Sequence, residues 1–135
     1  MELKKKTVIF FLVIVLFFSC RETKDDIEQK IIGDWQMVNF STNQIINNKE
    51  QYRKVATQMI MSTSLIINSN GTIKSIIWGT MEQGFWQVKN NFLVVYDQNK
   101  RERFRAQILK VTDTQLLLFQ KVDNVKVLLY FRKIN

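Results

Sequence analysis

The chain has 135 residues, the size of a single domain, and its formal net charge at pH 7 is +8. Histidine is absent and there is one cysteine. This excludes a Cys/His zinc site, an internal disulfide and a Ser-His-Asp or Cys-His catalytic set. Proline is absent and only 4 residues are glycine, which excludes collagen-like and Pro/Gly-rich disordered chains, while 46% hydrophobic residues are enough to bury a core.

The first twenty residues have the order of a bacterial secretory signal. Lysines at positions 4–6 precede an apolar run from Val8 to Phe18, and the small Ser19 stands before Cys20. The run is shorter than the roughly 20 helical residues that span a bilayer. Residues 16–20, Leu-Phe-Phe-Ser-Cys, resemble the lipobox of bacterial lipoproteins, whose cysteine is acylated and becomes the new N-terminus. The resemblance predicts a signal peptide over 1–19 and lipidation of Cys20, and the alternative is an uncleaved signal anchor.

Residues 21–30 are polar, with Ile27 as the one apolar residue, so we expect residues 20–30 to be the acylated cysteine followed by a tether. Acyl chains on Cys20 would then hold the protein on a membrane. In lipoproteins of some Gram-negative bacteria an aspartate after the cysteine marks retention on the inner membrane. The Arg21 found here therefore implies the outer membrane, on its periplasmic face or at the cell surface. Lys24-Asp25-Asp26 looks like a signal for export to the surface.

From residue 31 onward, period-two alternation between turn residues predicts about eight strands. Asn70-Gly71 and Asn90-Asn91 indicate two tight hairpin turns. The expected strands are residues 32–40, 64–68, 72–78, 83–89, 92–97, 102–111, 114–121 and 125–133.

One segment between the first two strands has helical spacing instead. Its apolar residues recur at intervals of three and four after the N-cap pair Asn47-Asn48, which predicts one amphipathic helix. These residues are Tyr52, Val55, Ala56, Met59 and Ile60.

Short links between strands require antiparallel neighbours, because a parallel pair needs a crossover of a dozen or more residues. Such a meander exposes two edges unless it closes on itself. We therefore predict an all-β domain over residues 31–135, with one short helix and an antiparallel barrel of about eight strands. A β-sandwich is the alternative.

Gly33-Asp34-Trp35 matches the Gly-x-Trp signature of lipocalins. In that family the tryptophan closes one end of the barrel and a basic residue on a late strand packs across its ring, so the resemblance implies a pair of Trp35 and Arg132. The order of motifs also resembles the lipocalin-like domains of short bacterial lipoproteins. The Asn70-Gly71 hairpin follows the first motif, and a second hairpin runs from Gly84 to Leu93.

Aromatic side chains are the candidate lining of an apolar ligand cavity, and the alternative is that they fill a core. Alternation alone does not tell which face of each strand points inward. The candidates are Trp78, Phe85, Trp86, Phe92, Tyr96 and Phe104.

These observations predict a lipoprotein that binds a small hydrophobic ligand. The alternative is an envelope interaction module, an inhibitor or assembly factor that binds a protein or glycan and holds no internal ligand. We expect no enzymatic activity, metal or cofactor, and no nucleic-acid partner, because nucleic-acid binding fits an exported protein poorly. A cavity of about 300 Å³ or more would favour the ligand carrier, and a filled barrel would favour the module.

Overall fold

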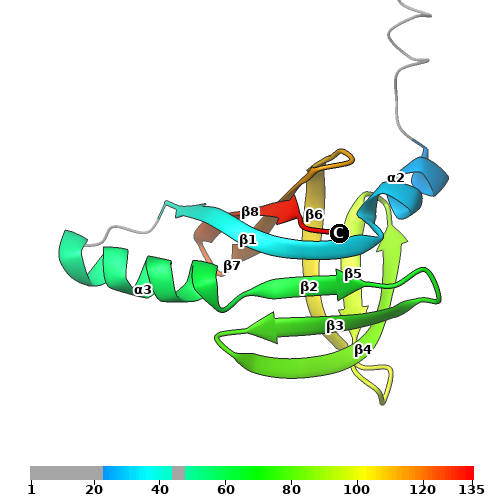
Figure 1. The fold of residues 1–135 in the computed structure, drawn as a ribbon, viewed down its shortest axis with the longest axis horizontal. Coiled ribbons are helices and arrows are strands. Elements are labelled where there is room, and N and C mark those ends of the chain that lie inside the picture. Colours follow the sequence, from blue (N-terminus) through cyan, green and yellow to red (C-terminus); the bar gives the residue numbers. More distant parts are fainter. Residues whose placement is uncertain (1–22, 44–47) are drawn as a thin grey trace, which may run out of the picture.

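The computed structural model describes residues 23–43 and 48–135, which form a closed barrel of eight strands (Figure 1). The fold confirms the predicted all-β class with an antiparallel barrel of eight strands, and the sandwich alternative is wrong. The elements in chain order are α2 (Lys24–Ile31), β1 (Gly33–Thr42), α3 (Lys49–Met61), β2 (Ser64–Ile67), β3 (Thr72–Ile77), β4 (Thr80–Lys89), β5 (Phe92–Tyr96), β6 (Glu102–Val111), β7 (Gln115–Val122) and β8 (Val125–Lys133).

Each strand pairs antiparallel with the next one in the chain, and β1 pairs with β8 to close the barrel. The seam runs from the pair Trp35 and Lys133 to the pair Thr42 and Val127. Closure leaves the sheet without an unpaired edge. It also separates an inner face from an outer face along every strand, because successive side chains alternate between the two.

Two of the hairpin turns depend on residues that tolerate a positive φ. Gly71 has φ 88° in the turn between β2 and β3, and Asn90 and Asn91 have φ 49° and 64° between β4 and β5. The consecutive positive φ angles of Asn90 and Asn91 give a turn whose twist matches that of the flanking strands. Both predicted turns are therefore confirmed.

Inward-facing apolar side chains form one core. On β4, for example, Gly84, Trp86 and Val88 are buried while the residues between them are exposed. The buried cluster comprises Ile27, Ile31, Trp35, Met37, Leu65, Ile67, Ile73, Trp86, Val88, Leu93, Ala106, Ile108, Val111, Leu116, Leu118, Leu129 and Phe131.

Helix α2 replaces the predicted tether over residues 24–30, while residues 20–22 lie outside the described residues. Thr23 and Asp26 make a capping box, in which each side chain accepts a hydrogen bond of 3.3 Å from the other residue's backbone N–H. Ile27 and Ile31 lie four residues apart, on one side of the helix, and both are buried in the barrel core. One apolar residue per turn is therefore enough to dock this polar segment, and the folded unit begins before residue 31.

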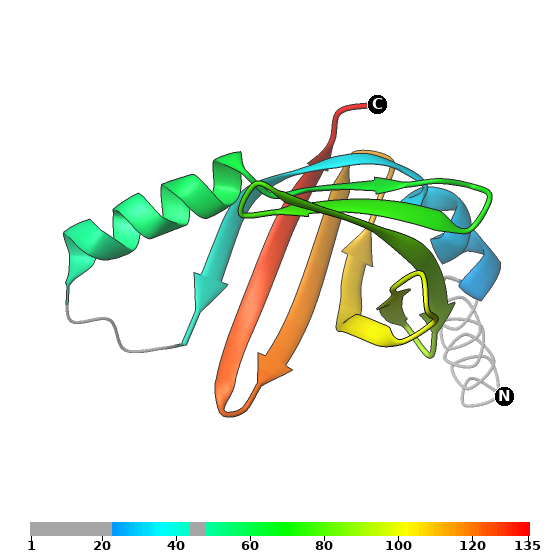
Figure 2. The ribbon, with the colours of Figure 1, turned by 90° about the horizontal axis from the view of Figure 1, so that it is seen from below.

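The predicted amphipathic helix is confirmed as α3. Its N-cap Asn48 accepts a hydrogen bond of 3.1 Å from the backbone N–H of Gln51. Tyr52 contacts Phe40 of β1, with 5.8 Å between ring centroids. Figure 2 shows that α3 and α2 lie at opposite ends of the barrel. In the part of the chain that the structure describes, neither helix has the length and apolar character needed to cross a bilayer.

Replacing Ile31 tests whether α2 belongs to the folded unit. Ile31 is 0% exposed. The change Ile31→Ala should lower the free energy of unfolding in urea by about 2–5 kcal/mol, because it opens a cavity in the core.

Ile134→Ala is the matched control, since that side chain is 60% exposed. Its cost should stay within about 0.5 kcal/mol. If the two variants lost the same stability, α2 would be a tether after all.

Candidate functional site

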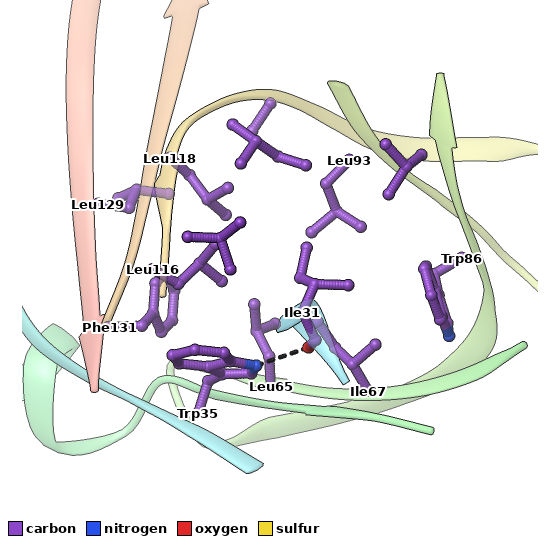
Figure 3. Packing of buried hydrophobic residues seen from close by; sticks show 14 of the residues in the cluster. Ile31, Trp35, Leu65, Ile67, Trp86, Leu93, Leu116, Leu118, Leu129 and Phe131 are labelled. Atoms are coloured by element: carbon purple, nitrogen blue, oxygen red, sulfur yellow. Dashed lines mark hydrogen bonds between the residues drawn. The ribbon is translucent and has the colours of Figure 1, made fainter. Parts of the chain in front are cut away.

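One end of the barrel is closed by Trp35 and α2. The indole of Trp35 is fully buried, and its Nε1 donates a hydrogen bond of 2.8 Å to the backbone oxygen of Ile31 (Figure 3). This bond satisfies the single polar atom of the ring, as burial of a tryptophan requires. The last turn of α2 is thus joined to the first strand at the base of the barrel.

The basic residue that packs on Trp35 is Lys133, not the predicted Arg132. Lys133 Nζ lies 4.9 Å from the centre of the Trp35 ring and also donates a hydrogen bond of 3.2 Å to the Lys30 oxygen. Alternation explains the correction: Phe131 is buried inside, Arg132 is exposed outside, and Lys133 turns back toward the ring.

The same contact explains the glycine of the Gly-x-Trp motif. Gly33 has φ 148°, and a Cβ at this position would lie 2.9 Å from Cε of Lys133. A side chain there would push the lysine away from the ring. Gly33 and Lys133 therefore form one arrangement around Trp35.

The other end of the barrel is hollow. A cavity of about 350 Å³ lies among residues of all eight strands and is flanked by Met59 of α3. Its apolar wall consists of aliphatic, methionine and phenylalanine side chains. These are Met37, Met59, Leu65, Ile77, Leu93, Val95, Phe104, Val127, Leu129 and Phe131.

Five polar residues also line this cavity, and we call them the collar: Thr63, Ser75, Glu82, Arg103 and Gln120. Ser75 and Glu82 are opposite each other on β3 and β4. Thr63 is 4% exposed, and its Oγ1 is buried without a hydrogen-bond partner among the described residues. The collar thus offers hydroxyl, carboxylate, guanidinium and amide groups above an apolar floor.

A β-bulge places Arg103 in the collar. Val95 pairs with Phe104 and Tyr96 with Glu102, so Arg103 is the extra residue of β6. Bulges redirect side chains and are common at the rims of barrels. Arg103 Nη2 lies 3.3 Å from Oε1 of Glu82, and both side chains are more than half exposed.

A second ion pair on β6 lies outside the cavity lining. Arg105 Nη2 donates a hydrogen bond of 2.6 Å to Oε1 of Glu102. The hydrogen bond from Arg105 lowers the pKa of the Glu102 carboxyl below its ordinary value, and the charge of the same guanidinium adds to the effect. The two pairs are similar in chemistry and differ in place, which makes the outer pair a control for the inner one.

Only one of the six predicted lining residues, Phe104, lines this cavity. Trp86 is buried in the core, where its Nε1 donates a hydrogen bond of 2.8 Å to the Asn68 oxygen. Trp78 lies in the turn after β3 and is 50% exposed, and Phe85 on the outer face of β4 is 40% exposed. Phe92 and Tyr96 do not line the cavity either. Arg105 lies over the ring of Phe92, and Lys89 lies over the ring of Tyr96.

The prediction missed most of the lining because the lining is aliphatic. If one residue of a strand is known to face inward, alternation identifies the others. On β8, Leu129 and Val127 share the inner face with Phe131, because they precede it by two and four positions. The sequence alone does not tell which residue faces inward, and the inward position of Trp35 is known only from the structure.

Two further hollows, of about 410 and 420 Å³, lie on the outside of the barrel. Phe85 lines both, and the outward-facing Lys74 and Gln87 line one each. Among residues 23–43 and 48–135 no three His, Cys, Asp or Glu side chains are grouped to hold a metal ion. The cavity inside the barrel is the candidate site, because it combines an apolar wall with the polar groups of the collar.

The chain is similar in structure to two solved proteins, each with 14% identity and a TM-score of 0.49. One is a lipocalin-like protein from Bacteroides uniformis ATCC 8492, with 78% of this chain and 99% of that chain covered. The other is an uncharacterized protein from Bacteroides eggerthii DSM 20697, with coverage of 76% and 98%. No protein-family model and no curated protein matches the sequence.

Replacing Lys133 tests its contact with Trp35. Lys133→Met removes the charge over the indole and the hydrogen bond to Lys30. The free energy of unfolding should fall by about 1–2 kcal/mol, measured by chemical denaturation.

Arg132→Met, one residue away and exposed, is the control and should change stability by less than about 0.5 kcal/mol. A larger loss for Arg132→Met than for Lys133→Met would restore the pairing expected from the sequence.

Proposed function

We propose that this protein binds a small hydrophobic molecule inside the barrel. The observation that carries the proposal is the cavity of about 350 Å³ at the end away from α2. Cavities of roughly 300–1,000 Å³ with apolar walls and a few polar groups are typical of small-molecule sites. An apolar ligand gains about 25 cal/mol for each Å² of surface that it removes from water.

The division of the barrel into a filled end and a hollow end supports this proposal. Eight strands enclose a space just wide enough for side chains or for one small ligand. Trp35 and Ile31 fill that space at one end, and Leu93 and Leu129 line the cavity above them. The lining residues therefore have a packed floor beneath them, which keeps the cavity shape fixed.

We further propose that acyl chains on Cys20 hold the barrel on the outer membrane. Cys20 lies outside the described residues, so the support is the order of lysines, apolar run, small residue and cysteine at positions 4–20. Two or more acyl chains anchor a protein stably, whereas one does so reversibly. The described chain begins its first helix at Lys24, only a few residues after the cysteine. The barrel would thus lie close to the membrane surface.

Filling the cavity tests the proposed ligand site. Val95→Trp places a large side chain in the lining. It should weaken binding of the neutral fluorescent probe N-phenylnaphthylamine by about tenfold or more, measured by fluorescence titration, because the apolar volume is taken up.

Val38→Trp is the matched control, since Val38 is exposed on β1 and does not line the cavity. Thermal unfolding confirms that both variants fold. If the probe binds neither variant less tightly than wild type, or does not bind wild type at all, the cavity is not a ligand site and the interaction module becomes the better account.

Replacing Cys20 tests the anchor. Full-length protein expressed in a Gram-negative host should enter the detergent phase in a phase-partitioning experiment, and Cys20→Ala should stay in the aqueous phase, because acyl chains cannot attach. A Cys20→Ala protein that still enters the detergent phase, or a wild-type mass without added acyl groups, would contradict the proposal.

A further inference from the structure

We infer that the ligand is an uncharged amphiphile, with an apolar chain in the barrel and a neutral headgroup of hydroxyl or ester oxygens in the collar. A fatty acylglycerol is the chemical class that fits. The inference rests on the proposed function and names the ligand class of that same cavity. Three observations carry it: the position of the polar lining, the unpartnered hydroxyl of Thr63 and the ion pair of Glu82 with Arg103.

Four of the five collar residues lie toward one end of the cavity, and Ser75 is the exception. Thr63 directly precedes β2, Glu82 is near the start of β4, and Gln120 is near the end of β7. Because the strands are antiparallel, these strand termini meet at the end of the barrel opposite Trp35. Ser75 lies deeper, opposite Leu65, and the other deep lining residues, Leu65, Leu93 and Phe131, are apolar. A ligand that matches both regions has its apolar part at the floor and its oxygens at the collar.

Thr63 supplies a hydrogen-bonding group that the fold leaves unused. Its backbone oxygen accepts hydrogen bonds from the Met37 backbone and from Nε2 of Gln36. Its side-chain Oγ1 is buried and has no partner within residues 23–43 and 48–135. A buried polar atom in this state destabilises a protein, and a hydroxyl both donates and accepts. A hydroxyl or ester oxygen of the ligand would complete this group.

The ion pair argues for a headgroup without charge. Glu82 and Arg103 face each other at 3.3 Å, and both line the cavity. A carboxylate ligand would be attracted by Arg103 and repelled by Glu82, and an ammonium ligand would meet the opposite balance. A neutral hydroxyl or ester oxygen can accept a hydrogen bond from the guanidinium, and a hydroxyl can also donate one to the carboxylate, while the pair stays intact.

The test compares three ligands with the same decyl-length chain and different headgroups. Decanoylglycerol, decanoate and decyltrimethylammonium each compete with N-phenylnaphthylamine for the wild-type protein. We expect decanoylglycerol to displace the probe at a concentration about tenfold or more below that of either charged ligand. Equal or tighter binding of decanoate or of the ammonium compound would overturn the inference.

A matched pair of variants tests whether the collar is responsible for the preference for neutral over charged ligands. Glu82→Gln removes the repulsion and frees Arg103, so decanoate should bind about tenfold more tightly than to wild type. Glu102→Gln makes the same change in the outer ion pair and should leave all three affinities unchanged. Decanoate binding that responds equally to both variants would place the selection in general surface charge and would contradict the collar.

Thr63→Val separates a ligand contact from a structural role. Valine keeps the shape and removes the unpartnered hydroxyl, so the melting temperature should stay the same or rise while decanoylglycerol binds about fivefold to tenfold more weakly. Unchanged affinity would show that Thr63 does not contact the headgroup.

The outcomes distinguish this inference from the proposed function. A probe that binds wild type and is displaced best by decanoate rejects the neutral headgroup and keeps the cavity as a ligand site. A probe that does not bind wild type rejects both.

Discussion

The pairing of β1 with β8 is the constraint on which the rest of the structure depends. Once this seam closes, eight strands enclose a space that must be filled by side chains, or by a ligand. At the end near Gly33 the space is filled, because Trp35 is buried there and α2 adds Ile27 and Ile31. At the other end no segment of the described chain enters the barrel, and the lining residues surround a cavity. The position of the candidate site therefore follows from where α2 docks.

The contacts around Trp35 and the position of the collar are linked through the register of the strands. Lys133 lies over the indole ring, and Gly33 leaves room for this lysine. The Ile31 oxygen accepts the hydrogen bond from the indole Nε1 of Trp35. This fixes the register of β1 against β8, and the register determines which residues of each strand face inward. Farther along the same strands, that alternation gives the cavity its apolar wall, and the bulge at Arg103 is the departure from it that brings a guanidinium beside Glu82. The packed base supports the lining residues from below, and support from rigid elements keeps the geometry of a site fixed.

Strands and turns could be predicted from the sequence because their signals are local. Asn70-Gly71 and Asn90-Asn91 end adjacent strands by their own backbone preferences, and the amphipathic spacing around Tyr52 gave α3. The site could not be predicted in the same way, because the inward face of a strand depends on partners far along the chain. Arg132 and Lys133 differ by one position, and only the pairing with Trp35 shows which of them reaches the ring. Helix α2 was not predicted, because the segment has a single apolar residue before Ile31 and the docking of Ile27 depends on the finished barrel.

The most direct test of a hollow barrel end that holds a neutral amphiphile is methyl NMR during titration with decanoylglycerol. The account predicts that methyl signals of Leu65, Leu93 and Leu129 shift and show intermolecular contacts with the acyl chain, because these residues line the cavity. Signals of Val88 and Leu116, which belong to the core and do not line the cavity, should stay in place. Shifts confined to exposed residues such as Val38 and Leu109, with the cavity methyls unchanged, would contradict it.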